Sequence, residues 1–254
     1  MTDVVLETDG LTKRFGELTA VDHVDLAVER GEFRSVIGPN GAGKTTLFNC
    51  ITGAMAPTSG TVTFDGEDIT DLPPYERVRR GLGRSFQITN VFDGLTVREN
   101  VRLAAQSVHE DDIGAGAGLF RNKDSFEDIS SHTTEVLDRI GLADRAAERA
   151  ETLAYGDQRR LEIGIVLATD PSLVLLDEPT AGMSAQETRA TMDLIDEVLF
   201  DRTLLLIEHD IDLVMRVSDK ITVLTRGEVL ASGTPEEIAN DEAVRDAYLG
   251  GARE

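Results

Sequence analysis

The sequence is poor in cysteine and lacks long apolar runs. Cys50 is the only cysteine, so an intrachain disulfide is excluded and a metal site built from thiolates is not expected. Charged residues interrupt each hydrophobic stretch, so no segment offers the ~20 apolar residues that a membrane-spanning helix needs. The first residues carry neither a basic region nor an apolar core and do not resemble a secretion signal. These absences predict a soluble, cytoplasmic protein.

Basic residues are also scarce. The chain has 47 acidic and 25 basic residues and a net charge of −22, and only four of the basic residues are lysines. A protein that binds nucleic acid presents a basic face to the phosphates. The sequence shows no such basic face, so no nucleic-acid partner is expected. An acidic, lysine-poor surface is typical of cytosolic proteins from salt-rich cells, which favours a halophilic interpretation. The alternative is ordinary solubility through negative charge.

Short apolar runs alternate with helical patterns, which predicts an α/β fold. At 254 residues the chain can bury a full core in one or two compact domains. Two runs, 173–176 and 203–207, are continuous and apolar apart from Thr203, as expected of strands buried on both faces. Further strands are expected at 26–28, 33–37 and 61–64, and a hairpin at 221–230.

The middle of the chain reads as helical. From Leu95 to Leu153 apolar residues recur at helical spacing, most clearly in 97–106 and 131–140. Between these two helices, residues 111–128 contain three glycines and predict a mobile loop. A helical subdomain inserted into an α/β core follows from this pattern.

One motif carries most of the functional information. Residues 38–45 read Gly-Pro-Asn-Gly-Ala-Gly-Lys-Thr, between the apolar run 33–37 and the helix-like run 46–52, which is the strand–loop–helix context of a phosphate-binding loop. Its glycines let consecutive N–H groups converge on an anion at a helix N-terminus. Lys44 would reach the β- and γ-phosphates, and Thr45 would ligate Mg²⁺.

This context argues against the alternative of a chance glycine-rich turn, so the motif predicts binding of a nucleoside triphosphate. The residues expected to bind it are Gly38, Pro39, Asn40, Gly41, Ala42, Gly43, Lys44, Thr45 and Thr46.

Two downstream strands end in residues suited to phosphate chemistry. The run 173–176 leads to Asp177, which would support Mg²⁺, and Glu178, which would polarise the attacking water. The run 203–207 leads to His209, and ligands of an open α/β sheet bind at this carboxyl edge, so His209 is expected to contact the γ-phosphate. A solvated acidic turn and a structural histidine are the respective alternatives.

Two further segments belong to the same constellation. Gln87 ends the segment 83–87, ahead of the helical region, and its amide would reach Mg²⁺ or the attacking water. Residues 153–160 read Leu-Ala-Tyr-Gly-Asp-Gln-Arg-Arg and open a helix expected to end near Ala168. A turn of small residues at a helix start is a second potential anion site.

The order of these elements resembles the ATP-binding-cassette (ABC) ATPases. The phosphate loop, Gln87, the Leu-Ala-Tyr-Gly segment, Asp177–Glu178 and His209 follow one another as in that family, over nearly the whole chain. Within the family, four stretches resemble the ATPase subunits of branched-chain amino-acid importers: 83–87, 153–156, 208–210 and 247–250. The long insert before Leu153 is also typical of that subgroup.

The resemblance implies a fold and a mechanism. The fold is expected to be one P-loop ABC ATPase domain over 1–254. In it, 1–93 and 170–254 form a RecA-like α/β core with an antiparallel β subdomain, and 94–169 form the helical signature subdomain. Two subunits, identical or different, are expected to pair head to tail, each offering residues 153–158 to the ATP held by the other. Closure over ATP and reopening after hydrolysis would drive the membrane subunits.

The resemblance also implies residue roles and partners. Ala154, Tyr155 and Gly156 are expected to contact the partner's ATP. Phe15 fits the position that stacks on adenine, the alternative being an ordinary core phenylalanine, and Ser184 falls in a loop that touches the second subunit. The other expected partners are transmembrane permease subunits, met through Gln87 and the residues after it, and indirectly a solute-binding protein. ATP and Mg²⁺ are the expected cofactors, with the ATPase on the inner face of the cell membrane.

The signature segment departs from the family's usual Leu-Ser-Gly-Gly-Gln. Ala154 removes a hydroxyl donor to the γ-phosphate, and Tyr155 replaces a glycine; both changes are usual in the amino-acid importer subgroup. Asp157 is less expected, since glutamine is common there. A carboxylate at a helix N-terminus is favourable as a cap but would lie near the partner's ATP. These departures bear on hydrolysis more than on ATP binding.

The sequence thus favours the ATPase of an importer that takes up amino acids, and among these it favours branched-chain amino acids. Two alternatives stay open: a cassette for urea, amides or a lipid, and a soluble cassette of DNA repair or translation. Soluble proteins of this kind usually contain two cassettes in one chain or a long coiled coil, and this sequence has neither. The signature and the spacing of the carboxylates argue against a P-loop kinase.

The charge balance predicts a dependence on salt. A strongly anionic chain repels an anionic nucleotide at long range, and about 1 M salt shortens the Debye length to roughly 3 Å, which removes the distant repulsion. Raising KCl to about 1 M is therefore expected to raise the melting temperature and the affinity for ATP. Thermal melting and nucleotide titration test this, and a melting temperature that stays flat across the range would contradict it.

Overall fold

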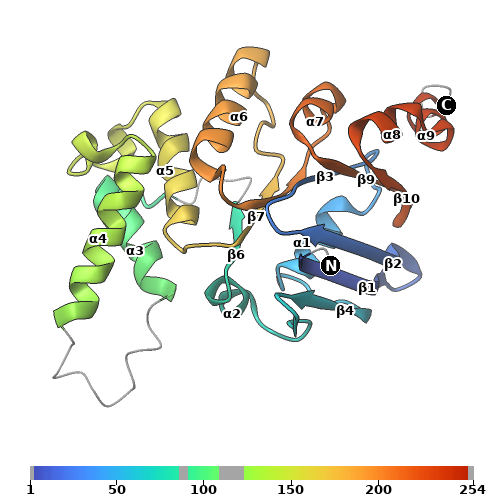
Figure 1. Ribbon diagram of the computed structural model, residues 1–254, viewed down its shortest axis with the longest axis horizontal. Coiled ribbons are helices and arrows are strands. Elements are labelled where there is room, and N and C mark those ends of the chain that lie inside the picture. The colour runs from blue at the N-terminus through green and yellow to red at the C-terminus, as the bar shows by residue number, and fades with distance from the viewer. Residues whose placement is uncertain (1–2, 86–90, 109–122, 251–254) are drawn as a thin grey trace. The chain divides into compact units, whose positions relative to one another are not determined.

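The computed structural model describes residues 3–85, 91–108 and 123–250 (Figure 1). The chain divides into two compact units, which are described separately. The first comprises Met1–Arg77, Leu173–Pro179 and Asp201–Glu254, and the second comprises Val78–Ser172 and Thr180–Phe200. No helix in the described part of the chain is long and apolar enough to cross a membrane.

The first unit contains an antiparallel sheet with the strand order β2-β1-β4-β5. β1 and β2 form a long hairpin that closes at the pair Phe15 and Leu18, and the other edge of β1 pairs with β4. The strands expected at 26–28 and 61–64 are confirmed as parts of this sheet. Its members are β1 (Val4–Phe15), β2 (Leu18–Glu29), β4 (Ser59–Phe64) and β5 (Glu67–Asp68).

The first unit also holds a largely parallel arrangement with the order β10-β9-β3-β8-β7. β3 pairs in parallel with β8 and β9, and β8 pairs in parallel with β7. Every residue of β7 and β8 is buried, which confirms the expectation from their continuous apolar runs. The strands are β3 (Phe33–Ile37), β7 (Leu173–Asp177), β8 (Thr203–Ile207), β9 (Lys220–Thr225) and β10 (Glu228–Gly233). The last two form the hairpin expected at 221–230.

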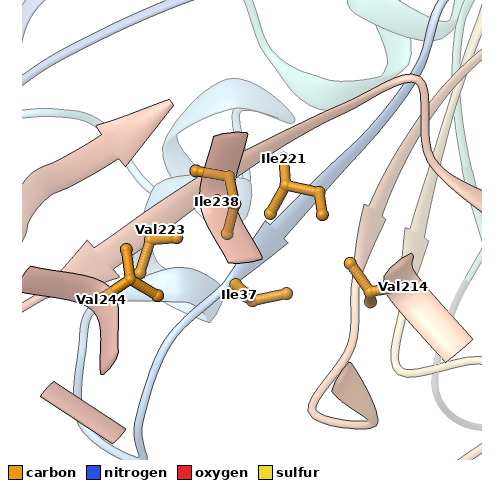
Figure 2. Packing of buried hydrophobic residues seen from close by; sticks show 6 residues of the cluster. All are labelled: Ile37, Val214, Ile221, Val223, Ile238 and Val244. Atoms are coloured by element: carbon orange, nitrogen blue, oxygen red, sulfur yellow. The ribbon is translucent and has the colours of Figure 1, made fainter. Parts of the chain in front are cut away.

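Helices bury one part of this sheet in an apolar cluster. Six side chains from β3, β9 and three helices converge there (Figure 2): Ile37, Val214, Ile221, Val223, Ile238 and Val244. Helices α8 and α9 lie beside β10 (Figure 1). The helices in or entering the first unit are α1 (Lys44–Ile51), α2 (Pro74–Arg79), α7 (Ile211–Val217), α8 (Pro235–Asn240) and α9 (Glu242–Gly250).

The second unit is mainly helical. α3 packs against α4 and α5, and α5 packs against α6. Gly164 allows α5 to pack closely against Ile140, because a Cβ at position 164 would lie 2.5 Å from Cδ1 of Ile140. The elements are β6 (Leu82–Ser85), α3 (Val97–Val108), α4 (Lys123–Arg139), η2 (Ala143–Arg145), η3 (Ala150–Thr152), α5 (Tyr155–Leu167) and α6 (Ala185–Leu199).

The loop expected at 111–128 is wrong in its last part. Helix α4 begins at Lys123, eight residues before the start that the apolar pattern favoured. Residues 123–128 contain neither glycine nor proline, and Phe126 continues the helical spacing toward Ile129, so nothing in this stretch opposes the helix. The remainder of the expected loop, residues 111–122, lies outside the described residues.

A buried arginine holds the carboxyl end of α1. Arg77 is 1% exposed, and its guanidinium donates to the Cys50 and Ile51 carbonyls in the last turn of α1, at 2.9 and 2.5 Å. It also donates to the carbonyls of Leu72 and Thr70, at 2.9 and 2.7 Å. Burial lowers the pKa of Arg77 from its ordinary value. The four carbonyls compensate for the lost hydration, and the charge complements the negative end of the helix dipole.

Replacing Arg77 with methionine is expected to lower the free energy of unfolding by about 3 kcal/mol or more, since each buried acceptor left without a donor costs about 1–3 kcal/mol. Arg77→Lys should recover only part of this loss, because an ammonium lacks the planar fork. Chemical denaturation measures both variants. The exposed Arg216 on α7 provides a matched control, expected to cost less than about 0.5 kcal/mol as alanine. Equal losses at the two arginines would contradict the prediction.

Candidate active site

Three neighbouring parallel strands bring their carboxyl ends to one edge of the sheet in the first unit. They stand in the order β3-β8-β7. β3 leads into the loop 38–43, β8 leads to Glu208 and His209, and β7 ends at Asp177. In open α/β sheets ligands bind at this edge, so the topology alone gathers the three sequence-predicted elements at one place.

The loop 38–43 depends on glycine for its path. Gly43, the residue before α1, has a φ of 100°, and a Cβ on it would lie 2.2 Å from the carbonyl oxygen of Ala20. The N–H of Gly227, in the turn between β9 and β10, donates to the Ala42 carbonyl at 3.0 Å. The loop is therefore held from two sides by backbone, in a conformation that a side chain at Gly43 would not allow.

Lys44 is the buried cation of this edge. It is 8% exposed, and its Nζ donates to the carbonyls of Gly38 and Pro39, at 2.7 and 3.3 Å. Burial lowers the pKa of Lys44, while the negative charges of Glu178 and Asp177 oppose that shift. The Lys44 Nζ thus lies between the loop and the end of β7, where a phosphate would meet it.

Asp177 and Glu178 follow each other at the end of β7 but differ in environment and backbone. Asp177 is 5% exposed, whereas Glu178 is half-buried and has a φ of 46°. The N–H of Glu178 donates to the carbonyl of Ile207 at 3.0 Å, which fixes this turn against β8. A left-handed glutamate is a strained conformation, and such strain is found at functional sites.

The donor set at this edge fits Mg²⁺. Helix α1 packs against β7, and the charge of Asp177 at the end of β7 acts on Lys44, the residue before Thr45 in the first turn of α1. A hydroxyl and a carboxylate are hard oxygen donors, and Mg²⁺ in nucleotide sites takes one or two protein oxygens together with phosphates and waters. Thr45 is exposed and Thr46 is half-buried.

His209 stands at the end of β8. Its side chain is 62% exposed, and its Nδ1 lies 3.6 Å from Oε2 of the fully buried Glu208. The same carboxylate accepts the backbone N–H of His209 at 3.2 Å. The next residue, Asp210, caps α7 by accepting the N–H of Leu213 at 3.0 Å. The imidazole is thus presented at the sheet edge by a fixed backbone.

Phe15 lies at the end of β1 and is 46% exposed, with Nζ of Lys13 at 5.3 Å from the ring centroid. This exposure excludes the alternative that Phe15 is an ordinary core residue. An exposed ring beside a cation on the first unit is compatible with stacking on a base.

The signature segment lies in the second unit. Ala154 is the N-cap of α5, and Tyr155 and Gly156 are its first residues, all three exposed. The guanidinium of Arg159 lies 5.8 Å from the Tyr155 ring centroid. Ser184 is the N-cap of α6, where it forms a capping box with Glu187, a structural role the sequence reading did not give it. Gln87 lies outside the described residues.

Comparison with known proteins decides the family. The sequence model of the ABC transporter family matches residues 21–181. The chain belongs to the ABC transporter family. A second model, described as branched-chain amino acid ATP-binding cassette transporter, matches residues 228–254. Membership confirms the predicted P-loop ABC fold and makes the chain an ATP-binding transporter ATPase.

Individual relatives agree. The chain is 44% identical, over 99% of its length and 100% of the relative, to LivG of Salmonella typhimurium, a high-affinity branched-chain amino acid transport ATP-binding protein. The ADP conformation of an ATP-binding cassette of an ABC transporter matches with a TM-score of 0.81 and 28% identity, over 98% of this chain and 100% of the other. A dimeric ATP-binding cassette bound to ADP and phosphate matches with a TM-score of 0.69 and 28% identity, over 91% and 98%.

The left-handed Glu178 predicts a trade between stability and activity. Glycine adopts this φ without strain, so Glu178→Gly is expected to be about 1 kcal/mol more stable to denaturant than Glu178→Gln, which keeps the strain. Both variants should lose turnover. Paired urea unfolding curves measure the difference, and equal stability of the two variants would show that this φ stores no strain.

Proposed function

We propose that this ABC ATPase powers the import of branched-chain amino acids. The observation that carries the proposal is the carboxyl edge of β3, β8 and β7, which gathers a phosphate loop, a histidine and a carboxylate pair. The family fixes ATP as the nucleotide. The full-length similarity to LivG and the match of residues 228–254 to a branched-chain amino acid cassette model support the cargo.

The residues of the edge take distinct roles in the proposed reaction. Lys44 binds the β- and γ-phosphates together with the loop residues Gly38, Pro39, Asn40, Gly41, Ala42, Gly43, Thr45 and Thr46, of which Pro39 alone has no backbone N–H to donate. Mg²⁺, when bound through Thr45, Asp177 and Gln87, would neutralise phosphate charge. Glu178 orients and polarises the attacking water, and His209 contacts the γ-phosphate. Phe15 stacks on the adenine.

The proposed working unit is a dimer. The second unit offers Ala154, Tyr155 and Gly156 to ATP held by a second cassette, which is either a second copy or a different chain. The division expected from the sequence, with 94–169 as the signature subdomain, belongs to this proposal. The match to a dimeric cassette bound to ADP and phosphate supports it.

The remaining partners follow from the importer role. Transmembrane permease subunits hold the ATPase on the cytoplasmic face of the cell membrane, and a solute-binding protein delivers the amino acid to them. The excess of acidic over basic residues, 47 against 25, supports work in a salt-rich cytoplasm.

Glu178→Gln is expected to keep ATP binding, to lower turnover at least about a hundredfold, since general-base catalysis contributes about 10²–10⁴, and to accumulate an ATP-dependent dimer. Turnover in molar KCl and molecular mass by light scattering measure these effects.

Lys44→Ala is the matched control, because it removes the phosphate contact and should lose both ATP affinity and the dimer. Unchanged turnover in Glu178→Gln would remove that residue from its role. With co-expressed permease subunits in vesicles, uptake of leucine but not of urea is expected. The reverse selectivity would overturn the proposed cargo.

A further inference from the structure

The signature helix begins with a negative charge close to its exposed end. Asp157 is the third residue of α5, after Tyr155 and Gly156. The N–H of Asp157 donates to the carbonyl of the N-cap Ala154 at 2.9 Å, whereas by helix geometry the N–H groups of Tyr155 and Gly156 precede the first helical acceptor and are available to an anion. An unpaired carboxylate one residue further along would oppose a phosphate at the same place.

The structure shows how this charge is held. Nη1 of Arg145 forms a short hydrogen-bonded ion pair with Oδ2 of Asp157, and the two side chains are 33% and 30% exposed. The same guanidinium binds Glu148 through Nε, at 3.1 Å to both carboxylate oxygens, and through Nη2 at 2.7 Å. The guanidinium therefore stands between two carboxylates, one from its own turn and one from the signature helix.

Arg145 itself is anchored by backbone. Its segment is tied to the start of α3, where the N–H of Arg98 donates to the Ala146 carbonyl at 3.0 Å and the N–H of Val97 donates to the Glu148 carbonyl at 2.9 Å. Such a platform lets one ion pair fix the side chain of Asp157, where two flexible surface side chains would gain little from pairing.

We propose that Arg145 is a positioning residue of the ATPase reaction. It neutralises and orients the carboxylate of Asp157, so that the first turn of α5 presents free N–H groups, and not an uncompensated charge, to the triphosphate bound by a second cassette. The inference rests on the proposed dimeric function and assigns Arg145 a task that arises from the aspartate in this signature.

The test is a double-mutant cycle in the Glu178→Gln background, with the ATP concentration for half-maximal dimer formation as the readout. Arg145→Ala is expected to raise this concentration about tenfold at low salt, the effect of one uncompensated charge near a triphosphate at a protein surface. In an Asp157→Gln chain, the same Arg145→Ala change should alter it less than about twofold, since the only carboxylate then left without Arg145 is Glu148, which is not on the signature helix. Arg145→Lys, which keeps the charge, should recover part of the loss.

Salt separates this role from a purely structural one. In about 1 M KCl the Debye length is roughly 3 Å, so the tenfold effect of Arg145→Ala should shrink. Arg149→Ala is the matched control, because Arg149 lies in the same segment, is exposed and pairs with the exposed Glu151. It should change nothing at either salt concentration. Thermal melting identifies any variant that has unfolded.

The outcomes are distinct. An equal effect of Arg145→Ala with aspartate or glutamine at position 157, or no effect with aspartate, would overturn the inference and leave the proposed function intact. A parent chain that binds ATP but forms no dimer, either alone or with a co-expressed second cassette, would overturn the dimeric function and the inference with it. A tenfold effect that depends on Asp157 and fades in high salt would establish both.

Discussion

The parallel pairing of β3, β8 and β7 decides where the proposed phosphate-binding residues of the first unit lie. Parallel strands end at the same edge of a sheet. This alone brings together the loop after β3, His209 after β8 and Asp177 at the end of β7. The apolar interior of β7 and β8 is the condition for this pairing, since a strand with neighbours on both sides must be buried on both faces.

Charge at this edge is balanced by burial and geometry. Lys44 loses hydration as it enters the site, and the loop carbonyls together with Asp177 and Glu178 compensate for that loss. The left-handed backbone of Glu178 is strained, and it holds the carboxylate close enough for its charge to act on Lys44. The signature segment instead carries an excess of negative charge, which Arg145 neutralises by forming an ion pair with Asp157.

The sequence predicted those features that local pattern determines. The phosphate loop is a contiguous motif, and β7 and β8 each contain four consecutive aliphatic residues, so both were predictable from the sequence. Long-range contacts could not. Arg77 binds carbonyls 26 and 27 residues away, and nothing in the sequence distinguishes it from its arginine neighbours. Asp157 is unusual in the sequence itself, whereas its pairing with Arg145 depends on how η2 folds against the start of α5. The start of α4 differs from the prediction because the glycines at 114, 116 and 118 favour a loop longer than the one that precedes Lys123.

The burial of Cys50 has a practical consequence. This cysteine is fully buried in α1, burial raises the pKa of its thiol, and the chain has no other. Toward alkylating reagents the folded protein therefore behaves as if it had no thiol, because the reactive thiolate is both rare and inaccessible. A cysteine introduced on the surface would be the only site to take up a fluorophore or spin label. Conversely, the rate at which Cys50 itself is modified would report how often α1, the helix that follows the phosphate loop, opens to solvent.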